Sequence, residues 1–175
     1  MGTLEDSIPQ LTPTRIAIYD DLLSAPRIVD IEPKEISQYM GEIAGMTYEL
    51  AQQKGGSIPY TVIREICENF IHAHFKTPCV SILDNGNTIK FTDQGPGIPD
   101  KQKAQRYFTS ATPEMRKYIR GVGAGLPLVR EWMEMSNGRL IIEDNIKEGT
   151  VVTIMLNQGV PNQIPVVYSL SLIHI

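Results

Sequence analysis

Hydrophobic positions recur with a helical period in two neighbouring segments near the start of the chain. Over residues 34–54 apolar side chains return every three or four positions, which predicts an amphipathic helix closed by a Gly-Gly pair. Over residues 57–75 the same period predicts a second helix, with Ser57 as its N-cap and Pro59 in its first turn. The pattern therefore predicts two helices in succession.

Short β-type runs follow the second helix. PCVSILD and NTIKFTD are joined by Asn85-Gly86, a pair typical of a tight two-residue hairpin. RLIIED and TVVTIML, joined around Glu148-Gly149, predict a second hairpin, and a third helix over residues 125–136 precedes them. Residues 1–33 read as an irregular, proline-punctuated arm, in which RIAIYD and RIVDIE can each pair as a strand.

Two segments lack any continuous apolar period. Residues 94–122 hold three glycines and three prolines and are longer than an ordinary connection, so we expect a mobile lid. The polar, proline-bearing run NQGVPNQIP, residues 157–165, is typical of a linker, and we expect residues 159–175 to be linker and tail. The final LSLIHI, residues 170–175, resembles a translated sequencing adaptor and is expected to be non-native.

Composition narrows the class of protein. With 175 residues, 42% of them hydrophobic, the chain can form one domain with a proper core. A net charge of -4 leaves no basic footprint for direct nucleic-acid contact, and no apolar run approaches the roughly 18 residues that span a bilayer. Cys67 and Cys79 lack CxxC spacing and read as core residues, and no leader pattern is present, so we expect a cytoplasmic protein.

The second predicted helix carries the first candidate for chemistry. In REICENF, Glu65 and Asn69 are four residues apart, which places a carboxylate and an amide on one helix face beside the apolar stripe. Polar groups in that position need partners, and a metal ion with polyphosphate would supply them. A solvated helix face is the alternative for this motif taken alone.

Two glycine-bearing stretches add further candidates. In DQGPGIPD, Asp93 ends a strand and can accept a hydrogen bond from an exocyclic amine, while Gly95 and Gly97 allow close backbone approach to a ligand; a plain turn is the alternative. In RGVGAGLPLVREW, three alternate glycines precede a helix start, where free N–H groups and the helix dipole favour phosphate. No strand precedes these glycines, which argues against a Rossmann turn, and glycines that serve only packing remain the alternative.

The order of the motifs is more specific than any one of them. E-x-x-x-N on a helix, D-x-G-x-G after a strand, G-x-G-x-G before a helix and G-T in a hairpin strand together resemble the GHKL superfamily of gyrase B, Hsp90, histidine kinases and MutL, over residues 34–157. The resemblance implies the Bergerat fold, an α+β two-layer sandwich with a mixed, mostly antiparallel sheet, about three helices on one face and a mobile ATP lid. It also implies ATP and Mg²⁺ as cofactors of a domain covering residues 34–158.

The same resemblance implies roles for individual residues. Glu65 would be the general base, Asn69 the Mg²⁺ ligand and Asp93 the reader of adenine, with Thr150 supporting the adenine site. His72 falls where many relatives place a Lys or Arg facing phosphate, and a structural histidine is equally compatible. Further nucleotide contacts would come from the glycine-bearing stretches, namely Gly95, Gly97, Gly121, Val122, Gly123, Ala124, Gly125 and Leu126.

Within the superfamily, FTSATPEMRKYIRGVGAGLPLVREW is similar to the lid of bacterial anti-sigma factors and switch-protein serine kinases, which phosphorylate Ser or Thr of a partner. This implies a regulatory protein partner and leaves a homodimer open. NGRLIIED and EGTVVTI suit a sensor histidine kinase equally. Such a kinase needs an acceptor histidine outside the nucleotide helix, whereas His72 and His74 lie within that helix and His174 lies in the tail expected to be non-native. A partner-directed kinase or ATPase, a non-catalytic ATP sensor within a larger transcription regulator, and a detached histidine-kinase catalytic domain remain the hypotheses.

Overall fold

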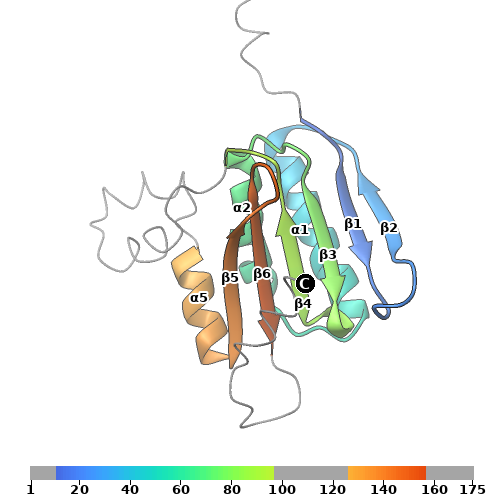
Figure 1. The fold of residues 1–175 in the computed structure, drawn as a ribbon, viewed down its shortest axis with the longest axis vertical. Coiled ribbons are helices and arrows are strands. Elements are labelled where there is room, and N and C mark those ends of the chain that lie inside the picture. Colours follow the sequence, from blue (N-terminus) through green and yellow to red (C-terminus); the bar gives the residue numbers. More distant parts are fainter. Residues whose placement is uncertain (1–10, 97–125, 157–175) are drawn as a thin grey trace, which may run out of the picture.

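A six-stranded mixed sheet with helices on one face organises the chain in the computed structural model, which describes residues 11–96 and 126–156 (Figure 1). The strand order is β2-β1-β3-β4-β6-β5. Only the β1–β3 pair is parallel, and every other neighbouring pair is antiparallel. The expected α+β sandwich is therefore confirmed. The strands are β1 (Thr14–Ile18), β2 (Arg27–Ile31), β3 (Cys79–Leu83), β4 (Thr88–Thr92), β5 (Gly138–Asp144) and β6 (Thr150–Leu156).

The segment expected as an arm contributes two strands to this sheet. β1 runs parallel to β3, with Ile16 opposite Val80 and Ile18 opposite Ile82. All four of these side chains are buried. β2 pairs antiparallel with β1 and forms the edge of the sheet. The apolar stretches near the start of the chain thus extend the core, through a pairing that spans more than 60 residues of sequence.

The first helix, α1 (Ile36–Gln53), begins and ends close to the predicted bounds. At its start the Glu35 carboxylate accepts hydrogen bonds from two backbone N–H groups of the first turn. At its end Gly55 adopts a φ of +100°, and the Gly56 N–H donates to the Ala51 carbonyl oxygen over 2.9 Å. This is a Schellman closure, and it confirms that the Gly-Gly pair ends the helix.

The second helix, α2 (Tyr60–His72), corrects one detail of the prediction. Pro59, with ψ of 150°, occupies the N-cap position, so Ser57 does not cap the helix. The Ser57 N–H instead donates to the Asn87 amide oxygen over 3.0 Å, which ties the entry of the helix to the β3–β4 connection. Pro59 needs no donor there because the first N–H groups of a helix have no partner within it.

The β3–β4 hairpin is present, but its turn is longer than the predicted two residues. Leu83 pairs with Thr88, which leaves residues 84–87 as the connection. Asn85 and Gly86 both have positive φ, as expected for this pair. A Cβ on Gly86 would lie 2.1 Å from the Ala51 carbonyl oxygen, so the turn is shaped by close packing on the end of α1.

The third helix, α5 (Leu126–Met135), ends two residues before Asn137, which has a φ of 59° and precedes β5. It packs against α2 and β5 and completes the helical layer. One cluster of buried side chains fills the space between the two layers. Its members include Ile16, Ile18, Ile43, Ala44, Ile63, Ile66, Phe70, Val80, Ile82, Ile89, Phe91, Val129, Met133, Val152 and Ile154.

Several predicted segments fall outside the described residues: most of the lid, and the linker with the final six residues. In the two described segments, no helix has the length and apolar character needed to cross a membrane.

Candidate functional site

Helix α2 presents the predicted acid–amide pair one turn apart on the side adjoining its buried stripe. Glu65 is half-buried, and Asn69 is only 9% exposed. Within the described segments, the Asn69 Nδ2 is buried and has no hydrogen-bond partner. Leaving such a donor unsatisfied costs on the order of 1–3 kcal/mol, so the position is suited to a polar ligand.

Asp93 lies directly after β4 and is 4% exposed. Its carboxylate Oδ1 accepts a hydrogen bond from the Gly95 N–H over 2.9 Å, and its backbone N–H donates to the Thr150 carbonyl oxygen over 3.0 Å. Burial raises the pKa of Asp93 above its ordinary value, although hydrogen bonding from the backbone of Gly95 and Thr150 opposes this rise. A buried carboxylate held by its own turn is a suitable acceptor for a ligand N–H group.

The end of α2 and the end of β4 meet at Gly95. A Cβ on Gly95 would lie 2.6 Å from both the Cα and the Cβ of Ala73, the residue that caps α2. The Ala73 N–H donates to the Asn69 carbonyl oxygen, which places Ala73 one helical turn beyond the candidate amide. The close approach predicted for Gly95 is therefore made by protein backbone, and it brings Asp93 beside the C-terminal end of α2.

Thr150, on the β5–β6 hairpin, lies beside Asp93. It is 4% exposed, begins β6 and accepts the Asp93 N–H. Gly149, just before it, has a φ of +98°, and a Cβ there would lie 2.0 Å from the Asp93 carbonyl oxygen. The structure thus gathers Asp93, Gly95 and Thr150 at the end of α2, where Asn69 also lies.

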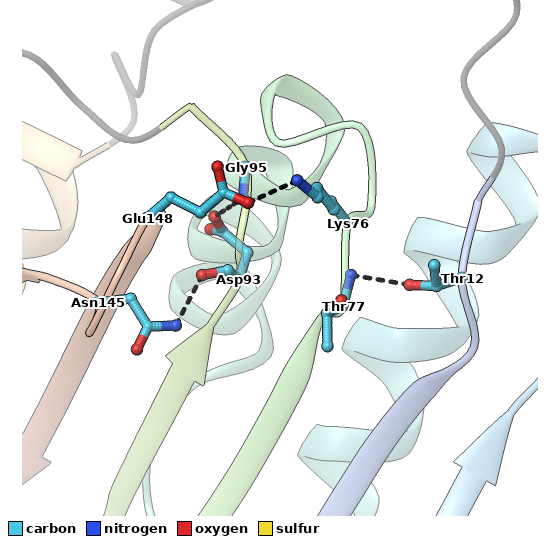
Figure 2. Close-up of polar contacts among 7 residues, drawn as sticks. All are labelled: Thr12, Lys76, Thr77, Asp93, Gly95, Asn145 and Glu148. Carbon is cyan, nitrogen blue, oxygen red and sulfur yellow. Dashed lines mark hydrogen bonds and ion pairs between the residues drawn. The ribbon is translucent and has the colours of Figure 1, made fainter.

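Other residues at this corner were not found by sequence reasoning. Asn145 donates from Nδ2 to the Asp93 carbonyl oxygen over 2.8 Å, and Lys76 forms an ion pair with Glu148 over 2.5 Å beside it (Figure 2). The Gln94 N–H donates to the Lys76 carbonyl oxygen over 2.9 Å. An asparagine and a glycine in a hairpin loop indicate a turn, but nothing local shows that the loop reaches a residue 52 positions earlier.

The remaining predicted site residues lie outside the described residues. These are Gly97, Gly121, Val122, Gly123, Ala124 and Gly125, together with the side chains of His72 and Leu126. The backbone of Leu126 begins α5, directly after the glycine cluster. In residues 11–96 and 126–156, no group of three or more His, Cys, Asp or Glu side chains could hold a metal ion.

Comparison with known proteins agrees with the fold and the motif order. Residues 56–159 match the family model described as histidine kinase-, DNA gyrase B- and HSP90-like ATPase. A 70-residue stretch is 30% identical to the circadian input-output histidine kinase CikA of Synechococcus elongatus, covering 39% of this chain and 9% of that protein. The crystal structure of the DIP2311 protein from Corynebacterium diphtheriae matches with a TM-score of 0.61 at 16% identity, over 88% of this chain and 35% of the other.

The mixed sheet, the layer of helices on one face and the buried Asp93 beside the end of α2 define a GHKL-type ATP-binding domain. The family model matches more than half of the length of this chain. The chain therefore belongs to the histidine kinase-, DNA gyrase B- and HSP90-like ATPases. The chain spans about a tenth of the length of CikA and about a third of the DIP2311 chain, and the likeness to the latter concerns the fold alone.

Proposed function

We propose that this chain binds Mg-ATP and transfers the γ-phosphoryl group to a Ser or Thr of a regulatory partner protein. The observation that carries the proposal is the Asn69 amide on α2, which is buried, lacks a partner for Nδ2 in the described structure and lies one turn from a half-buried Glu65. A buried donor of this kind is suited to oxygen-rich ligands such as a polyphosphate.

Asp93 would recognise the adenine base of the nucleotide. Its carboxylate would accept a hydrogen bond from the exocyclic N6 amine of adenine, with Thr150 supporting the same subsite. The supporting geometry is the burial of Asp93 and the fixing of its Oδ1 by the Gly95 N–H. A purine that carries an oxygen at position 6 would present an acceptor to this acceptor and would bind more weakly.

Asn69 would hold Mg²⁺. The Oδ1 of the same amide is an oxygen ligand of the kind that Mg²⁺ prefers, while its Nδ2 would donate to a phosphate oxygen. Since the described residues contain no cluster of metal-binding side chains, most of the ligands would be nucleotide phosphate oxygens and water. When bound, Mg²⁺ would neutralise charge on the phosphates.

Glu65 would act as the general base. Its carboxylate would accept the proton of the partner's hydroxyl as that oxygen bonds to the γ-phosphorus, while the bond from the γ-phosphorus to the β–γ bridging oxygen breaks and ADP leaves. Its place one turn from Asn69 on α2 supports this role, because base and cation ligand would then be held by one rigid element.

A histidine acceptor is the second candidate, and the match to a circadian input-output histidine kinase favours it. In this chain the histidines are His72, His74 and His174, and the first two lie in α2 or at its end. The acceptor histidine would therefore lie outside the nucleotide-binding helix. The chemical stability of the phosphate separates the two candidates, because phosphoserine and phosphothreonine survive acid whereas phosphohistidine does not.

The test uses γ-labelled ATP, Mg²⁺ and the proteins that copurify with the full chain. An acid-stable label on a partner, lost in Glu65→Gln while that variant still binds ATP, is the expected result. Glu68→Gln is the matched control, because Glu68 is a carboxylate on the same helix to which the proposal gives no role in transfer; it forms an ion pair with Arg64 over 3.3 Å. Labelled phosphate alone would indicate an ATPase, and stoichiometric retention of ATP without turnover would indicate a sensor. Either outcome, or equal transfer by Glu65→Gln, would contradict the proposal.

A further inference from the structure

The loop between β5 and β6 holds the backbone of Asp93 through one side chain. Asn145 Nδ2 donates to the Asp93 carbonyl oxygen over 2.8 Å (Figure 2), although the two residues are 52 positions apart. The other end of the same amide accepts the Ile146 N–H over 2.8 Å. Because one end meets an acceptor and the other a donor, the orientation of the amide is unambiguous.

The rest of the loop reinforces this contact. The Asn145 backbone N–H donates to the Gly149 carbonyl oxygen over 3.0 Å, which closes the loop on itself. Gly149 lies so near that a Cβ would come within 2.0 Å of the Asp93 carbonyl oxygen and 2.7 Å of the Gln94 Cα. The Asp93 carbonyl is thus confined between the Asn145 amide and the Gly149 backbone. The Asp93 N–H, in turn, donates to the Thr150 carbonyl oxygen.

All three anchors lie on the β5–β6 hairpin, and the Asn145 side chain contacts the Asp93 carbonyl oxygen and not the carboxylate. The carboxylate accepts the Gly95 N–H instead, within its own turn. Fixing the peptide groups on both sides of the Asp93 Cα fixes the direction of its Cα–Cβ bond, and the Gly95 N–H then holds the carboxylate in one rotamer. The hairpin can therefore determine where the carboxylate points without touching a ligand.

We propose that Asn145 is a positioning residue for the Asp93 carboxylate and thereby sets the preference of the site for adenine over 6-oxo purines. The inference rests on the proposed function, in which Asp93 accepts the N6 amine. An error of a few tenths of an ångström at a single hydrogen bond weakens the contact with the amine, whereas contacts to the phosphates are made elsewhere in the site.

The experiment measures dissociation constants for ATP and inosine triphosphate, which differ at position 6, by calorimetry on the full chain. Asn145→Ala is expected to lower the ratio of inosine triphosphate to ATP dissociation constants about three- to tenfold, the effect of one neutral hydrogen bond. Asn145→Asp has the same size and keeps an oxygen for the Ile146 N–H, but turns an acceptor toward the Asp93 carbonyl oxygen. It should lower the ratio at least as far.

Two controls separate positioning from a general structural effect. Lys147→Ala alters an exposed side chain of the same loop and should leave the ratio unchanged. In an Asp93→Ala background, Asn145→Ala should no longer change the ratio, since its effect passes through the lost carboxylate. The calorimetric stoichiometry reports the folded fraction of each variant, so loss of folded protein is not read as loss of preference.

The outcomes distinguish the two claims. If the wild type does not discriminate between the nucleotides, the adenine role of Asp93 is overturned and the role of Asn145 with it. If the wild type discriminates and both Asn145 variants keep the full ratio, only the Asn145 inference fails. An equal effect of Asn145→Ala with and without the Asp93 carboxylate would also overturn it.

Discussion

Replacing Gly149 by alanine should destabilise the fold strongly, because the structure leaves no room for the added methyl group. The new Cβ would lie 2.0 Å from the Asp93 carbonyl oxygen and 2.7 Å from the Asp93 carbonyl carbon. Both are backbone atoms, so neither can move aside without shifting the end of β4. In addition, the φ of +98° is unfavourable for any residue with a Cβ.

The two effects can be given rough magnitudes. Overpacking at a well-packed site costs about 1–3 kcal/mol, and a backbone conformation of this kind costs about 1–3 kcal/mol. We therefore expect a loss of about 3 kcal/mol, with relaxation of the loop absorbing part of the sum. For a chain of this size that loss corresponds to roughly 6–12 °C in melting temperature.

Gly45→Ala is the matched control, with the opposite sign. Gly45 lies inside α1, and a Cβ there would meet nothing within 4 Å. The substitution should stabilise the protein by about 0.5–1 kcal/mol, because alanine favours the helix over glycine. Urea unfolding measures both variants, provided the slope with denaturant is unchanged. A Gly149→Ala protein within 0.5 kcal/mol of wild type, or a destabilised Gly45→Ala protein, would refute this reasoning.

Four further predictions follow from the buried and paired groups. Burial raises the pKa of Asp93 in the folded state. The free energy of unfolding of wild type, relative to that of Asp93→Asn, should therefore fall as pH rises from the ordinary aspartate pKa through the raised one. A difference that does not change with pH would contradict this. Asn69→Leu should leave stability without nucleotide unchanged or higher, yet abolish the thermal shift with Mg-ATP. The Cys67 thiol, whose pKa burial raises, should react with a thiol reagent only on unfolding; rapid reaction in the native protein would contradict this. Lys76→Ala should change stability by less than about 1 kcal/mol, since Lys76 and Glu148 are each 53% exposed.

Local patterns in the sequence predicted the helices and both hairpins, because periodicity and turn residues are local properties. They also placed Glu65 and Asn69 on one face of α2, since helical spacing alone determines this. Details that depend on tertiary contacts were less accurate. The Ser57 N–H donates to the Asn87 side chain, and Ser57 does not cap α2. The β3–β4 turn is longer than two residues, and its Gly86 packs on the end of α1.

Long-range contacts explain what the sequence could not predict. The parallel pairing of β1 with β3 joins strands more than 60 residues apart, so apolar stretches near the start of the chain carried no signal of their place in the sheet. Asn145 reaches Asp93 across 52 positions, and a loop asparagine looks the same whether or not it makes such a contact. The motif order, by contrast, indicated the family because it is itself a long-range pattern.

The central claim is that adenosine triphosphate binds where α2, the end of β4 and the β5–β6 hairpin meet. Calorimetric titration of Mg-ATP into wild type and Asp93→Ala tests it most directly. The account predicts one nucleotide per chain for wild type and at least tenfold weaker binding for the variant, the loss expected for a hydrogen bond to a charged group. No heat with wild type, or equal affinity in the two proteins, would contradict it.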